Sequence, residues 1–138
     1  MEARQGRVPG RRRSAILIVG EETEILRRYA RSCSAYGYAV DLATDGETAA
    51  RLASERRFDV VVSDIGKQGS SGCDSLRRLR EQHRGVPMVV LSSGLAFASA
   101  RAAVDCGAHK FLLKPVSDER LLEVLVGAMR DRPSRLDS

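Results

Sequence analysis

The sequence contains no tryptophan, only three tyrosines, three phenylalanines and three cysteines. The cysteines are odd in number and widely scattered, and none belongs to a CxxC or Cys/His cluster with the spacing of a zinc site or a disulfide framework. We therefore expect reduced thiols. Because aromatic side chains are so scarce, no cluster of them marks a surface where a protein partner would bind.

Long apolar runs are also missing. No run approaches the ~20 residues that a membrane-spanning helix needs. Residues 1–14 lack the apolar core of a secretory signal. We expect a soluble, cytoplasmic protein that does not enter a membrane.

Two further absences argue against an independent enzyme. The chain has no glycine-rich phosphate loop of the P-loop or dinucleotide-binding type. The two histidines, His83 and His109, do not follow a predicted strand beside a nucleophile. We expect them to be exposed helix-end and loop residues, and we do not expect catalysis on a separate substrate.

What is present is the composition of one folded domain with a basic tail. Hydrophobic residues make up 43% and charged residues 30% of the 138, which is typical of a globular domain. The net charge is +5, but five arginines against one glutamate fall within residues 1–13. We divide the chain into a flexible basic N-terminal tail (1–13), a folded domain (14–130) and a C-terminal tail or linker stub (131–138). The tail has no aromatic residue to stack on bases, so contact with nucleic acid is expected through this tail at most.

Short apolar runs alternate with amphipathic stretches along the folded part. The apolar runs predict strands at residues 15–19, 38–43, 58–63, 86–91 and 110–113. Helical spacing predicts helices around residues 25–36, 45–54, 76–79, 96–106 and 121–129, with Ser117 as the cap of the last one. Strands that are almost entirely apolar and alternate with helices indicate an α/β fold, a parallel sheet covered by helices on both faces.

Polar side chains follow the predicted strands at one edge of this sheet. In such sheets ligands bind beyond the carboxyl ends of the strands, where the winding reverses. Phosphoryl transfer to a carboxylate needs a nucleophilic oxygen, a cation held by oxygen ligands, and donors for the other phosphoryl oxygens. Each residue alone also has an ordinary structural explanation, but their occurrence in order favours a site. The candidates are Asp64 as nucleophile, Glu21 and Glu22 as metal ligands, Ser92 as hydroxyl donor and Lys114 as cationic clamp.

Four segments carry a resemblance to a known family. They are ILIVGEETEILRR, VVVSDIGKQGSSG, VPMVVLSSG and GAHKFLLKP, and they occur in the order and at the intervals of the family. Over about residues 14–130 the chain resembles the receiver domain of bacterial two-component response regulators. The resemblance implies a doubly wound (βα)5 flavodoxin-like fold with a five-stranded parallel sheet of order 2-1-3-4-5.

The resemblance also implies a function. A receiver takes a phosphoryl group from a histidine kinase or phosphotransfer protein with the help of Mg²⁺, and phosphorylates and dephosphorylates itself at most. On this analogy Asp64 is the phosphoacceptor, Ser92 and Lys114 bind the acyl phosphate, and Phe111 is the aromatic switch residue. The metal ligands would be Glu21, Asp64 and the backbone carbonyl of Gly66, and the Lys114-Pro115 bond would be cis. Signalling would run through the face formed by helix 4, strand 5 and helix 5.

The chain departs from the family where the first strand ends. A typical receiver has two acidic residues there, whereas this chain has Gly20 followed by Glu21. Cation affinity depends on the number and placement of charged oxygens, so we expect weak Mg²⁺ binding and slow or weakly Mg²⁺-dependent phosphorylation. With fewer carboxylates around Asp64, its ion pair with Lys114 could persist without metal.

Three functions stay open at this point. The first is a phosphorylation-controlled switch. The second is a degenerate receiver that binds a protein partner without phosphate, which Gly20 favours. The third is the N-terminal receiver of a longer effector protein. The sequence leaves open the cognate kinase, the output partner and whether the domain forms a homodimer.

Overall fold

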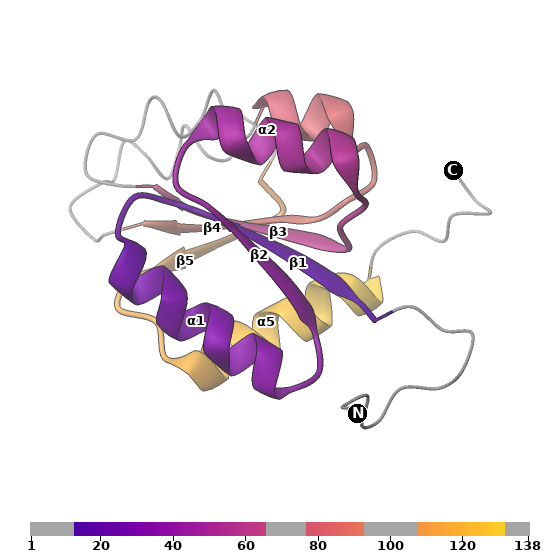
Figure 1. Cartoon of the computed structure of the whole chain (residues 1–138). Coiled ribbons are helices and arrows are strands. Elements are labelled where there is room, and N and C mark those ends of the chain that lie inside the picture. The colour runs from indigo at the N-terminus through magenta and orange to yellow at the C-terminus, as the bar shows by residue number, and fades with distance from the viewer. Residues whose placement is uncertain (1–12, 66–76, 93–107, 132–138) are drawn as a thin grey trace, which may run out of the picture.

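The computed structural model describes residues 13–65, 77–92 and 108–131 (Figure 1). Five parallel strands form one sheet in the order β2-β1-β3-β4-β5, which confirms the predicted fold class and strand order. The strands are β1 (Ala15–Val19), β2 (Ala39–Ala43), β3 (Val60–Ile65), β4 (Met88–Ser92) and β5 (Lys110–Leu113). Apart from Arg13 and Asp131, the latter being the last residue of the final helix, the predicted tails lie outside the described residues, as do the helix around residues 96–106 and Gly66.

Helices cover both faces of the sheet. Figure 1 shows α1 (Thr23–Ala35) and α5 (Asp118–Asp131) side by side on one face, with α2 (Gly46–Glu55) and the helical residues 77–82 on the other. No helix in the described ranges is long and apolar enough to cross a membrane. The chain leaves α1 through Gly37, whose φ of 96° is in the left-handed region that favours glycine.

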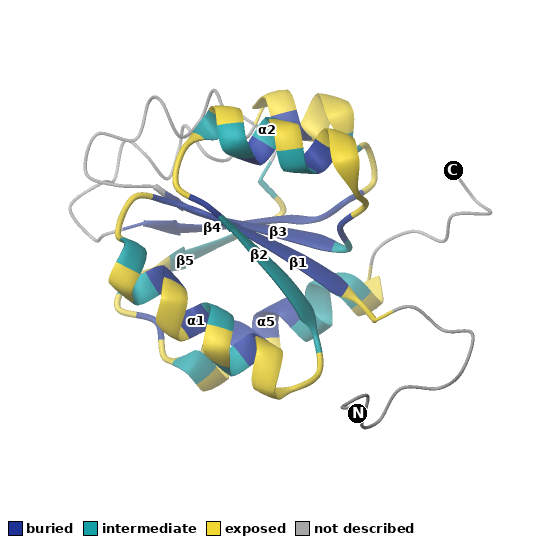
Figure 2. Cartoon of the chain, viewed as in Figure 1, coloured by how far each residue is buried: buried dark blue, intermediate teal, exposed yellow. Residues whose placement is uncertain are grey.

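The alternation along each strand divides the core into two clusters. Leu17 of β1 packs in the cluster on the α2 side, while Ile16 and Ile18 pack in the cluster with α1 and α5. The inner strands β1 and β4 are buried along their whole length, whereas the edge strands β2 and β5 are mostly half-buried (Figure 2). The sheet therefore holds the carboxyl ends of its central strands between two packed layers.

Several predicted boundaries are wrong by one or two residues. β3 and β4 do not stop before Asp64 and Ser92 but contain them, because the backbone pairing of β3 with β4 continues through Ile65 and Ser92. Ladder hydrogen bonds come from the main chain, so a polar side chain does not end a strand. The predicted strand at 86–91 starts at Met88 instead, after Pro87, which has no N–H to donate to a ladder.

Side chains of two residues cap helices where they begin, and one of the two caps, Ser117, was predicted. Asp45 is the N-cap of α2, and its carboxylate accepts a hydrogen bond from the backbone N–H of Thr48 at 2.7 Å. This hydrogen bond lowers the pKa of Asp45. Ser117 precedes α5, and its hydroxyl accepts from the backbone N–H of Arg120 at 3.0 Å. The structure therefore confirms Ser117 as the cap of the last helix.

Candidate functional site

Asp64 lies near the carboxyl end of the central strand β3. It pairs in register with Leu91 of β4, and its side chain is only 2% exposed. One carboxylate oxygen, Oδ1, binds Lys114, while Oδ2 is buried and has no hydrogen-bond partner among the described residues. A carboxylate with one satisfied and one unsatisfied oxygen is poised to take up a further positively polarised group.

Lys114 follows directly after β5 and reaches across β4 to Asp64. Its backbone N–H donates to the carbonyl of Ser92 at 2.7 Å, which fixes the start of the loop beside the end of β4. Its ammonium lies 2.8 Å from Oδ1 of Asp64 and 3.1 Å from Oε1 of Glu22. The Lys114-Pro115 bond is cis, as predicted. The Lys114 ammonium therefore bridges two carboxylates, one near the carboxyl end of β3 and one just beyond the carboxyl end of β1.

Burial and charge act in opposite directions at this pair. Burial raises the pKa of Asp64, and the adjacent Lys114 ammonium offsets part of that rise. Burial alone would lower the pKa of Lys114, but its hydrogen bonds to Asp64 and Glu22 outweigh this effect and leave the pKa raised. The lysine is thus held firmly in its charged form next to the candidate phosphoacceptor.

Gly20 leaves no empty space where a second carboxylate would stand. A Cβ added at Gly20 would lie 2.9 Å from Cβ of Asp64 and 2.9 Å from Cδ1 of Leu26. Leu26 of α1 is itself only 1% exposed. The space beside Gly20 is therefore filled by Asp64 and by an apolar residue, and no pattern in the sequence indicates this.

The other predicted site residues differ in how far they are exposed to solvent. Ser92 is fully buried at the end of β4, beside Leu113 in register. Phe111 of β5 is half-buried against the core on the α2 side. Glu21 is exposed directly after Gly20. Gly66 lies outside the described residues, so its predicted carbonyl ligand has no counterpart there.

The contact of Glu22 is the main feature of the site that sequence reasoning missed. Glu22 was a candidate metal ligand, but its carboxylate contacts Lys114. It is the N-cap residue of α1, directly beyond the end of β1. An acidic residue and a lysine predicted at the same sheet edge indicate that an ion pair can form there. Neither spacing nor composition predicts which carboxylate the lysine contacts.

The oxygen atoms around Asp64 are of the kind that bind a divalent cation, but few of them carry a negative charge. Mg²⁺ prefers oxygen ligands, and the unsatisfied Oδ2 of Asp64 is a buried oxygen that lacks a positive partner. Glu21 supplies a second carboxylate at the same edge. Within the described ranges, however, no cluster of three or more acidic, histidine or cysteine side chains could hold a metal.

Comparison with known proteins agrees with this geometry. The response regulator receiver domain family matches residues 16–126, which is most of the chain. The chain belongs to this family. The receiver domain is 33% identical to the response regulator MprA of Mycobacterium sp. (strain KMS) over 115 residues, covering 83% of this chain and 50% of MprA. It therefore spans about half the length of this curated relative.

Solved structures support the same fold. The receiver domain of NtrX from Brucella abortus is 30% identical, with a TM-score of 0.77 over 84% of this chain and 98% of that one. A response regulator from Burkholderia pseudomallei is 27% identical, with a TM-score of 0.73 over 81% of this chain and 66% of that one. The latter structure contains a phosphorylated aspartic acid and a calcium ion.

Proposed function

We propose that this receiver domain accepts a phosphoryl group on Asp64 from a histidine kinase or phosphotransfer protein. The observation that carries the proposal is the 2.8 Å contact between Asp64 and Lys114 at the carboxyl edge of the sheet. The phosphorylated aspartic acid in the Burkholderia pseudomallei relative supports it. The proposal includes a cytoplasmic location and an output through the face of helix 4, β5 and α5, with Phe111 and Ser92 as switch residues.

The transfer exchanges one bond to phosphorus for another. A carboxylate oxygen of Asp64 attacks the phosphorus of a phosphohistidine, the P–N bond breaks, and its electron pair stays on the imidazole nitrogen, which then takes a proton. The product is an acyl phosphate on Asp64. The Lys114 ammonium then binds a phosphoryl oxygen, and the Ser92 hydroxyl donates to another.

Mg²⁺ is the proposed cofactor. Glu21, Asp64 and the backbone carbonyl of Gly66 would hold it, and its charge would neutralise the phosphoryl oxygens during transfer. The Lys114 ammonium already supplies one positive charge at Asp64, while Gly20 removes one metal ligand. We infer that the cation is bound weakly.

Phosphorylation by acetyl phosphate, followed by intact mass, tests the proposal. We expect the wild-type domain to gain one phosphoryl group slowly, with a weak dependence on Mg²⁺, and Asp64→Asn to gain none. Asp41→Asn is the matched control, because Asp41 lies on the edge strand β2 and pairs with Arg56 instead of Lys114. A folded wild type that gains nothing at any Mg²⁺ concentration would contradict the proposal, and so would equal modification of Asp64→Asn.

A degenerate receiver that binds its partner without phosphate is the second candidate. The filled space at Gly20, where this chain lacks a carboxylate, favours it. Under this function the partner binds wild type and Asp64→Asn equally well, and acetyl phosphate changes neither affinity. Because the chain spans about half of MprA, a further effector region in the full protein is a third proposal, with its activity unassigned.

A further inference from the structure

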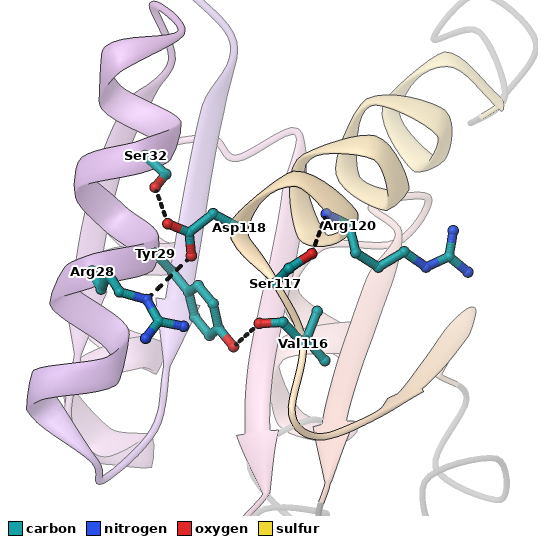
Figure 3. Close-up of polar contacts among 7 residues, drawn as sticks. All are labelled: Arg28, Tyr29, Ser32, Val116, Ser117, Asp118 and Arg120. Atoms are coloured by element: carbon teal, nitrogen blue, oxygen red, sulfur yellow. Dashed lines mark hydrogen bonds and ion pairs between the residues drawn. The ribbon is translucent and has the colours of Figure 1, made fainter.

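The loop that follows Lys114 is fastened to α1 by a buried hydrogen bond. The hydroxyl of Tyr29, a residue only 2% exposed, donates to the backbone carbonyl of Val116 at 2.8 Å (Figure 3). Val116 lies two residues beyond Lys114. The segment from Lys114 to Val116 is therefore held at both ends, by β4 through the carbonyl of Ser92 and by α1 through Tyr29.

A second set of contacts holds Asp118, the first residue of α5, against α1. Asp118 accepts a hydrogen bond from the Ser32 hydroxyl at 2.7 Å and from Nε of Arg28 at 3.2 Å. The Arg28 guanidinium lies 5.3 Å from the centre of the Tyr29 ring, within the range of a cation–π contact. Figure 3 shows these side chains directed from α1 toward the start of α5. The exposed ion pair adds little energy, so the buried Tyr29 contact is the stronger attachment.

We propose that Tyr29 is a positioning residue for Lys114, holding the loop so that the lysine ammonium stays on Asp64. This inference rests on the proposed function of Asp64. A lysine side chain is long and flexible, so its reach depends on where its backbone is fixed. Without the Tyr29 hydroxyl, the buried carbonyl of Val116 loses its partner and the loop shifts to find water.

The surroundings of the Tyr29 hydroxyl are consistent with a link between Tyr29 and the Asp64–Lys114 pair. Burial raises the pKa of Tyr29, and the charges of Arg28, Asp64, Asp118 and Lys114 also act on it. Because the Tyr29 hydroxyl binds the carbonyl of Val116, only Pro115 separates its attachment point from Lys114 along the loop. The ring of Tyr29 belongs to the core cluster of α1 and α5, while its hydroxyl is the part that reaches the loop after Lys114.

The test uses Tyr29→Phe, which keeps the ring and removes only the hydroxyl. Tyr38→Phe is the matched control, since Tyr38 is half-buried at the edge of the same cluster. The chain has only three lysines, Lys67, Lys110 and Lys114, so the side-chain ammonium signals of a ¹⁵N-lysine-labelled sample are easily assigned. Proton exchange of the Lys114 ammonium and the rate of phosphorylation by acetyl phosphate are measured for each folded protein.

We expect Tyr29→Phe to speed ammonium exchange at Lys114 and to slow phosphorylation by about threefold to tenfold, the factor that corresponds to one net hydrogen bond. Tyr38→Phe should leave both unchanged. Wild-type exchange and phosphorylation in Tyr29→Phe, with only a lower unfolding midpoint, would overturn the proposal and leave Tyr29 a structural residue. If the wild type takes up no phosphate, the proposed function fails, but the exchange at Lys114 still decides the role of Tyr29.

Discussion

Gly20 shows how one residue sets both the charge and the packing of the site. The position carries no side chain, and the space beside it is occupied by Asp64 and Leu26. Any side chain introduced there would force Asp64 or Leu26 to shift, because its Cβ would lie 2.9 Å from the Cβ of Asp64 and from Cδ1 of Leu26. The absence of a side chain at position 20 and the close approach of Asp64 and Leu26 to it are therefore one structural feature.

Gly20→Ala should destabilise the domain by about 1–3 kcal/mol, the usual cost of overpacking a core. Gly127→Ala is the matched control: a Cβ added there in α5 would meet nothing within 4 Å, and the change should stabilise by up to about 1 kcal/mol through helix propensity. Urea unfolding of both variants measures the difference. A Gly20→Ala variant at least as stable as wild type would show that Leu26 yields without cost.

At the scale of elements, His109 extends the pairing of β4 with β5. Its backbone N–H donates to the carbonyl of Met88 at 2.8 Å, and its ring Nδ1 accepts from the backbone N–H of Met88 at 3.0 Å. The ring must be unprotonated at Nδ1 to accept. His109 is exposed as predicted, but nothing in the sequence indicated that its ring accepts a backbone hydrogen bond.

For His83 the expected exposure is wrong, because the residue is half-buried and its ring contacts the carbonyl oxygen of Ala53.

The pH dependence of stability should report the His109 contact. Burial lowers the pKa of His109, and the nearby positive charge of Arg80 adds to the effect. Because the folded-state pKa lies below the unfolded one, the contribution is present above the ordinary histidine pKa of about 6.5 and is lost as the pH falls through the folded-state pKa. We expect the stability advantage of wild type over His109→Gln to shrink between about pH 7 and pH 5. Urea unfolding across this range measures it, and a pH-independent advantage would contradict the assignment.

At the scale of the whole molecule, two cores share one sheet. Leu17 lies in the core on the α2 side and Leu91 in the core with α1 and α5, and both are fully buried. The sheet joins them, so loss of packing on either face should weaken one cooperative unit.

Leu17→Ala and Leu91→Ala should therefore each lower the free energy of unfolding by about 2–5 kcal/mol. Leu113→Ala is the control, because Leu113 is 59% exposed on the edge strand β5, and should change little. Urea unfolding followed by circular dichroism and by tyrosine fluorescence gives the comparison. Separate transitions for the two probes in either variant would show that the two faces unfold independently.

The local pattern of residues was sufficient for the architecture. Apolar runs of strand length, helical spacing between them and a capping Ser117 depend on neighbours in the chain. The five strands, α1 and α2 lie within two residues of their predicted bounds, and Ser117 caps α5. The placement of Asp64, Ser92 and Lys114 at one edge followed from the parallel sheet, since parallel strands bring their carboxyl ends together.

By itself, then, the sequence determined the α/β architecture, the family and the group of residues gathered at the sheet edge. Only the tertiary structure decided that Lys114 binds Asp64 and Glu22 together, that Leu26 fills the space at Gly20, and that Tyr29 holds the loop after Lys114. Periodicity records which face of an element is buried. The choice among partners on that face depends on distances between segments as many as 92 residues apart in the chain, which only packing fixes.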